Sequence, residues 1–211
     1  MDIKSQIDLV LKKHRGLNYI ESQNIIIGKL QISDNDFYEI KIDLTPYPKA
    51  FPKVEEVGER IPKKADRHIY TDSGSCCFTT RAIAEILLKT KVKSINDFIK
   101  LIVIPYFENN SFYEINKYYL NGEFSHNIQG ILEGYKEILG LKNDYKTLKI
   151  INDEVRGNNT HISAKCYCGS TKSLKNCSSG KHFKNYRKFK LIDKSTLTYD
   201  LVQILDFLIK K

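Results

Sequence analysis

Four of the chain's five prolines lie between positions 46 and 62, and this stretch limits what the surrounding sequence can form. Proline fixes its own φ and lacks a backbone N–H, so a helix cannot run through such a segment. The stretch must therefore be extended or looped. It separates a first part of the chain that carries strand patterns from a later part, beyond residue 80, in which helical patterns dominate.

The sequence before the prolines predicts one helix and two paired strands. Residues 3–14 place apolar side chains at helical spacing, with Asp2 as the expected N-cap. Residues 24–32 are rich in β-branched side chains, and residues 37–44 alternate apolar with polar side chains. The Ser-Asp-Asn-Asp sequence between these two segments is typical of a turn, so we expect a β-hairpin.

Apolar spacing after residue 80 predicts further helices, in the segments 83–90, 94–105, 128–139 and 195–208. Ser94, with Asp97 three residues later, resembles a capping box, and Pro105 is expected to end or kink that helix. Gly140 is expected to close the third helix, and Ser195 to cap the last. This order of elements predicts an α+β fold.

The positive charge of the chain is concentrated near its C-terminus. The formal net charge is +9 at pH 7, yet residues 165–194 contain nine Lys or Arg and a single acidic residue, Asp193. The other 181 residues are nearly neutral, with 25 basic and 24 acidic side chains. This asymmetry predicts a main domain over residues 1–157 and a small basic, cysteine-containing module over residues 158–211.

The sequence predicts a cytoplasmic location, and the number of cysteines fits such a location. No apolar run approaches the ~20 residues of a membrane helix, and the N-terminal sequence lacks the apolar stretch of a secretory signal, so we expect a cytoplasmic protein without membrane contact. The five cysteines form an adjacent pair, Cys76 and Cys77, and a later group, Cys166, Cys168 and Cys177. An odd number in such a chain argues against a disulfide framework and favours reactive thiols and a metal site.

The segment 44–78, LTPYPKAFPKV…RHIYTDSGSCCF, resembles the active-site region of the ubiquitin-conjugating enzymes. The residues that carry the resemblance are the pairs Tyr47-Pro48 and Phe51-Pro52, the single His68 and the run Gly74-Ser75-Cys76-Cys77. It implies that Cys77 holds an acyl group as a thioester, while Cys76 stands where the family has an aliphatic residue. In element order the resemblance extends over residues 1–140 and implies an antiparallel sheet flanked by helices.

Cysteine chemistry suits this role, because a thiolate is the nucleophile and a thioester retains enough free energy to acylate an amine. The alternative is that Cys76 and Cys77 are a pair of small buried apolar residues. Adjacent residues on an extended backbone point to opposite sides. We therefore expect Cys76 to be buried and Cys77 to be presented to a partner.

The chain departs from the family beside the cysteine loop. The family has His-Pro-Asn, whose Asn amide steadies the oxyanion when lysine attacks, whereas here the sequence is His68-Ile69-Tyr70. The loop backbone or another side chain must therefore donate to the oxyanion. The candidate side chains are Tyr70, Asp72, Ser73 and His126. His68 itself either takes part in catalysis or only hydrogen-bonds and shapes the loop.

A second resemblance concerns the transferred group. Residues 119–140 resemble the standalone conjugating-like proteins of bacterial antiphage operons, through Gly122, His126, Gly130 and Tyr135. A turn followed by an amphipathic helix explains the same pattern. The resemblance implies a transferase that accepts the C-terminal glycine of a ubiquitin-like protein or of a cyclic-nucleotide synthase, from an activating enzyme where one is needed, and passes it to a target lysine. The alternative is a non-catalytic docking protein.

The last three cysteines resemble the small zinc motif found at the end of the bacterial secretion ATPase. Their spacing is C-x-C-x₈-C, and the expected ligands are Cys166, Cys168, Cys177 and His182, with His182 reached over residues 178–180. If His182 does not reach the cysteines, the site is degenerate and metal-free. The flanking basic residues, interleaved with the aromatic residues Phe183, Tyr186 and Phe189, fit nucleic acid or an acidic protein surface. The alternative is a solvated face that binds neither.

Overall fold

The computed structural model describes residues 2–120, 125, 127–158 and 160–210 of the chain. The chain divides into two compact units, one made of residues 1–79 and 87–123 and the other of residues 80–86 and 124–211. Helix α2 (Arg81–Thr90) spans the division between residues 86 and 87. In the described part of the chain, no helix combines the length and apolar character that crossing a membrane requires.

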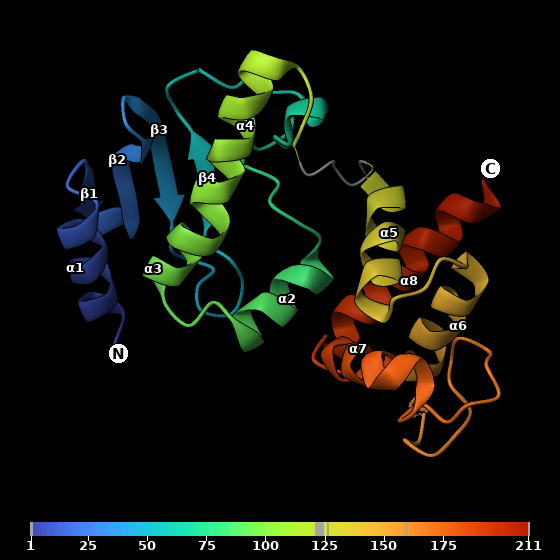
Figure 1. The fold of residues 1–211 in the computed structure, drawn as a ribbon. Helices are drawn as coiled ribbons and strands as arrows, with labels where there is room; N and C mark the ends of the chain where they lie inside the picture. The colour runs from blue at the N-terminus through green and yellow to red at the C-terminus, as the bar shows by residue number, and fades with distance from the viewer. Residues whose placement is uncertain (1, 121–124, 126, 159, 211) are drawn as a thin grey trace. The chain divides into compact units, whose positions relative to one another are not determined.

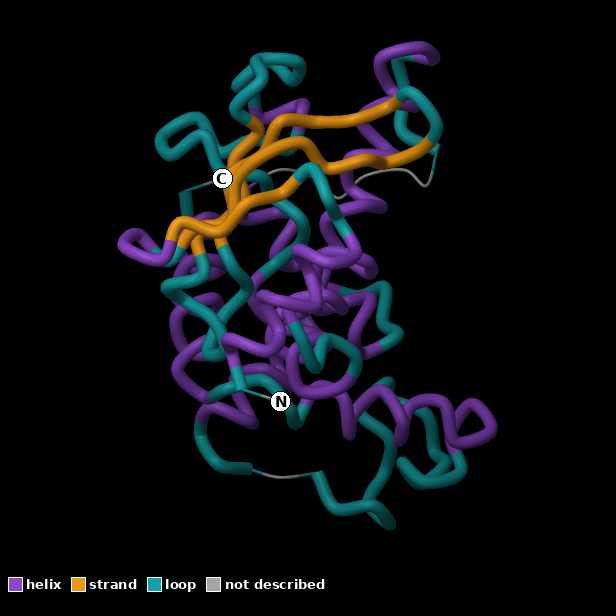
Figure 2. The backbone as a smooth tube through the Cα atoms, turned by 90° about the vertical axis from the view of Figure 1, so that its left-hand side faces the viewer, coloured by secondary structure: helices purple, strands orange, loops and turns teal. Residues whose placement is uncertain are grey.

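The first unit contains a four-stranded antiparallel sheet with the strand order β1-β2-β3-β4 (Figures 1 and 2). Its elements are α1 (Ile3–Lys13), β1 (Leu17–Ile20), a 3₁₀ turn (Glu21–Gln23), β2 (Ile25–Ser33), β3 (Asp36–Asp43), β4 (Lys53–Glu56), a 3₁₀ turn (Ala65–Arg67), α3 (Ile95–Phe98) and α4 (Ile104–Asn116). Each strand therefore pairs with the next one along the chain. The predicted α+β class is confirmed, and β1 is a strand that the sequence analysis did not predict.

Local sequence accounts for most of these elements. The Asp2 side chain accepts a hydrogen bond from the Ser5 N–H and so caps α1, as predicted. The predicted hairpin is formed by β2 and β3, and Asn35 in its turn adopts a left-handed φ of 61°. The alternating side chains of β3 put Tyr38, Ile40 and Ile42 into the core. Tyr38 stacks there on Phe107 of α4, with ring centroids 4.4 Å apart.

Pro105 was expected to end or kink the helix that begins at Ile95, but the helix does not end there, because helical backbone continues to Asn116. The backbone from Ile99 to Val103 forms a π-helical turn, and α4 begins directly after it with the proline in its first turn. A π turn changes the hydrogen-bonding pattern by one residue. The missing N–H of the proline and its ring are thereby accommodated where an uninterrupted α-helix would have to kink or break.

The second unit is helical. Its elements are the 80–86 part of α2, α5 (Asn127–Leu139), α6 (Asp144–Val155), a 3₁₀ turn (Cys177–Gly180), α7 (Lys181–Phe189) and α8 (Lys194–Ile209). Gly140 has a φ of +69° directly after α5, as expected of a closing glycine. The prediction of Ser195 as the cap of the last helix was wrong, because α8 begins at Lys194 and its N-cap residue is Asp193. Helices α6 and α7 were not predicted.

The core of the second unit joins residues on both sides of the predicted division at residue 157. Leu139 of α5 and Ile151 of α6 are fully buried in one cluster with Phe189 of α7 and Ile204 of α8. The Tyr135 hydroxyl of α5 donates a buried hydrogen bond of 2.8 Å to Asp200 of α8. The compact unit that contains the basic module therefore begins before α5, because the apolar faces of α5 and α6 pack against the C-terminal helices.

Substituting Gly28 with alanine is expected to destabilise the first unit by about 2–3 kcal/mol. Gly28 has a φ of +137°, and an added Cβ would lie 2.2 Å from the Gly16 carbonyl oxygen, which is part of the backbone. Gly74→Ala is the matched control, because Gly74 also has a positive φ but its nearest neighbour would be the flexible Lys63 side chain at 3.6 Å. Denaturant unfolding that shows equal losses for the two variants would contradict this prediction.

Candidate functional site

The cysteine loop, residues 68–77, is held against β4 by main-chain hydrogen bonds. Isolated antiparallel bridges pair Ile69 with Cys76 and Glu55 with Ser75. Within the loop, the Cys77 N–H donates to the His68 carbonyl over 2.7 Å. The Cys76 N–H donates to the Val54 carbonyl, also over 2.7 Å. The backbone that leads up to the Cys77 side chain is therefore fixed by hydrogen bonds.

The two adjacent cysteines have different environments, as expected. Cys76 is only 6% exposed and belongs to the core of the first unit, whereas Cys77 is half-buried. Burial raises the pKa of Cys76 to about 12, although a hydrogen bond with the Tyr106 side chain opposes the shift. Burial also raises the pKa of Cys77, and a hydrogen bond with the Tyr70 side chain lowers it. Both thiols are therefore protonated at neutral pH, and Cys77 needs a base to react.

Tyr106 of α4 holds the cysteine loop by hydrogen bonds. This role was not predicted from the sequence. The Tyr106 hydroxyl donates to the carbonyl oxygens of His68 over 3.0 Å and of Arg67 over 3.3 Å. The Arg67 side chain is buried, donates to Asn110 over 3.0 Å and stacks on the Tyr113 ring. These contacts come from a helix about 40 residues further along the chain, so local spacing could not reveal them.

The predicted site residues near Cys77 differ in what they contact. His68 has a left-handed φ of 53°, and its ring lies edge-on to Tyr119 with centroids 5.1 Å apart. Tyr70 is 50% exposed and hydrogen-bonds the Cys77 thiol. Asp72 and Ser73 are exposed, and the Asp72 carboxylate accepts the Ser73 N–H over 2.8 Å. His126, the fourth proposed oxyanion donor, lies outside the described residues. Among the described candidate donors, Tyr70 is the one whose side chain lowers the pKa of the Cys77 thiol.

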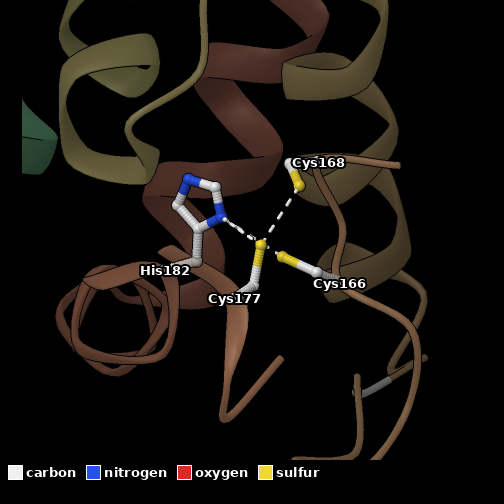
Figure 3. A group of neighbouring side chains, drawn as sticks. All are labelled: Cys166, Cys168, Cys177 and His182. Atoms are coloured by element: carbon white, nitrogen blue, oxygen red, sulfur yellow. Dashed lines mark hydrogen bonds between the residues drawn. The ribbon is translucent and has the colours of Figure 1, made fainter. Parts of the chain in front are cut away.

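The second site is a cluster of cysteine and histidine side chains in the second unit (Figure 3). One ligand atom from each of the predicted residues Cys166, Cys168, Cys177 and His182 lies within 4.8 Å of all the others. His182 Nδ1 is 3.3 Å from the Cys166 Sγ and 3.2 Å from the Cys177 Sγ. The Cys168 and Cys177 sulfurs are 3.6 Å apart. The four side chains converge on one point and can hold a metal ion there.

Two local conformations bring these ligands together. Cys166 and Cys168 lie on a small hairpin in which Lys165 pairs with Ser173 and the Cys166 N–H donates to the Lys172 carbonyl over 3.0 Å. After Cys177, residues 178–180 all have positive φ values, between 47° and 80°. This left-handed turn leads directly into α7 and places His182 in its first turn. His182 therefore reaches the cysteines, which the sequence left open.

The donor set fits a tetrahedral zinc ion. Zn–S bonds of about 2.3 Å and Zn–N bonds of about 2.0–2.1 Å require ligand atoms roughly 3.5–3.8 Å apart. The three separations given above, 3.2–3.6 Å, are close to that value. Hydrogen bonds from Ser170 help lower the pKa of Cys168 to about 7 against the effect of burial, and the Ser170 hydroxyl lies 3.2 Å from the Cys177 sulfur. The lowered pKa of Cys168 favours its thiolate, the form that binds zinc, whereas burial raises the pKa of Cys166 to about 12.

Comparison of the chain with protein families, with curated proteins and with solved structures finds no match. The resemblances carried by the cysteine loop and by the C-terminal cysteines therefore stay predictions. Function has to be argued from the two cysteine sites themselves.

Proposed function

We propose that this protein is a ubiquitin-conjugating-like acyl transferase, with Cys77 as the residue that carries the acyl group. The observation that carries the proposal is the presentation of Cys77 on a backbone-locked loop at β4, beside a buried Cys76. The order of one helix, a four-stranded antiparallel sheet and then the cysteine loop agrees with the expected element order. A loop position also suits a site that two proteins must reach.

The chemistry follows from the thiol. The Cys77 proton is lost to a base, and the sulfur attacks the carbonyl carbon of an activated acyl donor, itself a thioester or an acyl adenylate. The donor's thiolate, or AMP in the case of an acyl adenylate, leaves, and the acyl group stays on Cys77 as a thioester. A lysine amine then attacks the same carbonyl, loses a proton and forms an amide, while the Cys77 thiolate leaves. The group transferred is the C-terminal glycine of a ubiquitin-like protein or of a cyclic-nucleotide synthase, in bacterial antiphage defence.

Tyr70 is the side chain best placed to stabilise charge in both steps. Its hydroxyl hydrogen-bonds the Cys77 thiol and lowers the pKa of that group. In a thioester on Cys77, the same hydroxyl is the proposed donor to the oxyanion. The Asp72 carboxylate is occupied by the Ser73 N–H, and its negative charge would oppose an oxyanion. Tyr70 therefore replaces the asparagine that the family uses.

Changing Tyr70 to phenylalanine is expected to slow acylation of Cys77 and discharge to lysine by roughly ten- to a hundredfold, because one donor is removed. The variant should also raise the pKa of Cys77 further, since the hydrogen bond that favours the thiolate is lost. Alkylation of Cys77 by iodoacetamide as a function of pH measures that shift. Tyr145→Phe is the control, because Tyr145 is 74% exposed and lies in the other unit.

A direct test uses the tagged full-length chain isolated from the cells that produce it. The expected product is a species heavier than the chain by the mass of a whole protein, present on a non-reducing gel and removed by dithiothreitol or hydroxylamine. Mass spectrometry should place the linkage on Cys77. If no such species forms even after reductants are excluded, the transferase proposal fails.

The metal cluster supports a second, non-catalytic component of the function. We propose that zinc is the metal, bound by Cys166, Cys168, Cys177 and His182. Three sulfur atoms and one imidazole nitrogen suit zinc better than they suit ions that prefer oxygen ligands. Four protein ligands close the coordination shell, so the ion is structural and takes no part in acyl transfer. The alternative function, a non-catalytic docking protein with a metal-binding tail, would need this module but not the Cys77 thiol.

A further inference from the structure

Helix α7 gathers four basic side chains on one face. At about 100° per residue, Lys181, Lys184 and Lys188 fall within an arc of about 60°, and Arg187 extends that arc to about 120°. All four are exposed. We call these four residues the α7 basic face. The helix begins beside the metal cluster, since His182 lies in its first turn.

Few acidic residues lie near the α7 basic face along the chain. Asp193 is the only acidic residue between positions 165 and 194. Lys190 does form an ion pair, with Glu154, and is therefore not counted as part of the face. Among the described residues, no ion pair involves any of the four members. Uncompensated cations on one helix face produce a local positive potential that attracts polyanions.

The chain segment that contains the α7 basic face exposes no apolar centre of the kind found in protein interfaces. Within residues 160–194, all of which the structure describes, no large hydrophobic side chain is exposed. Protein interfaces have an apolar core and are depleted in lysine, whereas nucleic-acid interfaces are polar and strongly positive. A phosphate backbone therefore fits this surface better than an acidic protein does.

The aromatic residues of α7 are not available to stack on bases. Tyr186 is 7% exposed and Phe189 is fully buried, and both belong to the core of the second unit. Phe183 is half-buried and packs against that core, with Arg187 lying 6.0 Å above its ring. The basic and aromatic residues that alternate in the sequence therefore lie on different faces of α7, the basic ones outside and the aromatic ones toward the core. Without an exposed aromatic platform, binding would rely on phosphates and not on bases.

We propose that the α7 basic face binds the phosphate backbone of duplex nucleic acid without sequence preference. This function is independent of acyl transfer on Cys77 and would hold the protein near nucleic acid. The affinity should fall steeply with salt, because each phosphate contact releases condensed counterions. Three to four contacts imply a slope of log K against log salt of roughly −3 to −4 for duplex DNA.

The test uses the full-length chain and a fluorescent 20-base-pair DNA duplex, with anisotropy measured from about 50 to 200 mM salt. In the test variant, Lys181, Lys184 and Lys188 are all changed to glutamine, which favours helix and removes three charges. In the control variant, Lys4, Lys12 and Lys13 are changed in the same way; these three are exposed on α1. Both variants have the same net charge. The test variant should bind at least tenfold more weakly than wild type with a slope flatter by about 2–3, and the control should be near wild type.

Several results would overturn the proposal. Equal weakening of the two variants would show a general charge effect, and absence of duplex binding by wild type at 50 mM salt would remove the function. A preference of more than tenfold for single strands would indicate base stacking. Binding of poly-glutamate in place of the duplex would assign the face to an acidic protein. Circular dichroism of both variants checks that α7 remains folded, and the salt slope of wild type tests the proposal without any substitution.

Discussion

Changing Cys77 to alanine is expected to abolish the reducible adduct completely, whereas Cys76→Ala should leave most of it. Only a sulfur can form the thioester, and Cys77 is the half-buried member of the pair. Cys77→Ser should give a smaller amount of an adduct that survives dithiothreitol, because an oxyester does not exchange with thiols. Non-reducing and reducing gels of the three variants, followed by mapping of the linked peptide, measure these outcomes.

The adjacent cysteine is a demanding control, because the two positions share the same loop and the same strand pairing. Cys76→Ala removes a buried sulfur that is 6% exposed, so a modest loss of stability is expected without loss of the adduct. Loss of the adduct in Cys76→Ala alone would transfer the carrier role to Cys76. Retention in both variants would place the linkage elsewhere. Either outcome would contradict the proposal that Cys77 carries the acyl group.

The free Cys77 thiol should be a slow nucleophile near neutral pH. Burial raises its pKa, so the thiolate fraction at pH 7 is smaller than for an exposed cysteine. The rate of alkylation at Cys77 should therefore keep increasing at pH values above the usual pKa of a cysteine thiol. This low basal reactivity is consistent with a carrier that must be deprotonated in complex with its acyl donor. It would also limit unwanted oxidation of an accessible sulfur.

The parts of the fold that the sequence predicts are those set by neighbouring residues. The Asp2 cap, the turn at Asn35 and the alternation along β3 each depend on side chains within a few positions of one another. The opposite environments of Cys76 and Cys77 also follow from local backbone geometry. Local rules were sufficient in these cases, because tertiary contacts agree with them.

Tertiary contacts decide the features that the sequence does not reveal. Pro105 stays within a helix because a π turn precedes it, and Tyr106, the next residue, can then support the cysteine loop. His182 joins the cysteines only because three consecutive residues turn left-handed, although two of them are serines. Such conformations are unfavourable for serine on their own. They become evident only when the packing that compensates for them is known.

The C-terminal cysteines should decide the stability of the second unit. Removing metal with a chelator under reducing conditions is expected to destabilise this unit by several kcal/mol, because a structural zinc ion contributes its binding free energy to folding. The hairpin that carries Cys166 and Cys168 contributes few apolar side chains to the core, Leu174 being a buried example. This hairpin should unfold first. Thermal unfolding of the chain with and without chelator, with zinc content measured by elemental analysis, tests the expectation.

Two histidines of the same module provide the matched comparison. His182→Gln removes the nitrogen that lies 3.2 Å from the Cys177 sulfur, so zinc content should fall well below one per chain and the melting temperature should drop. His161→Gln changes an exposed histidine whose ring contacts Ser163, and it should leave both quantities unchanged. Equal zinc content in the two variants would remove His182 from the ligand set. Wild-type protein that carries no zinc when purified without chelator would contradict the metal site itself. Because Cys77 lies in the other unit, its adduct need not depend on zinc, and this difference separates failure of the metal proposal from failure of the transferase.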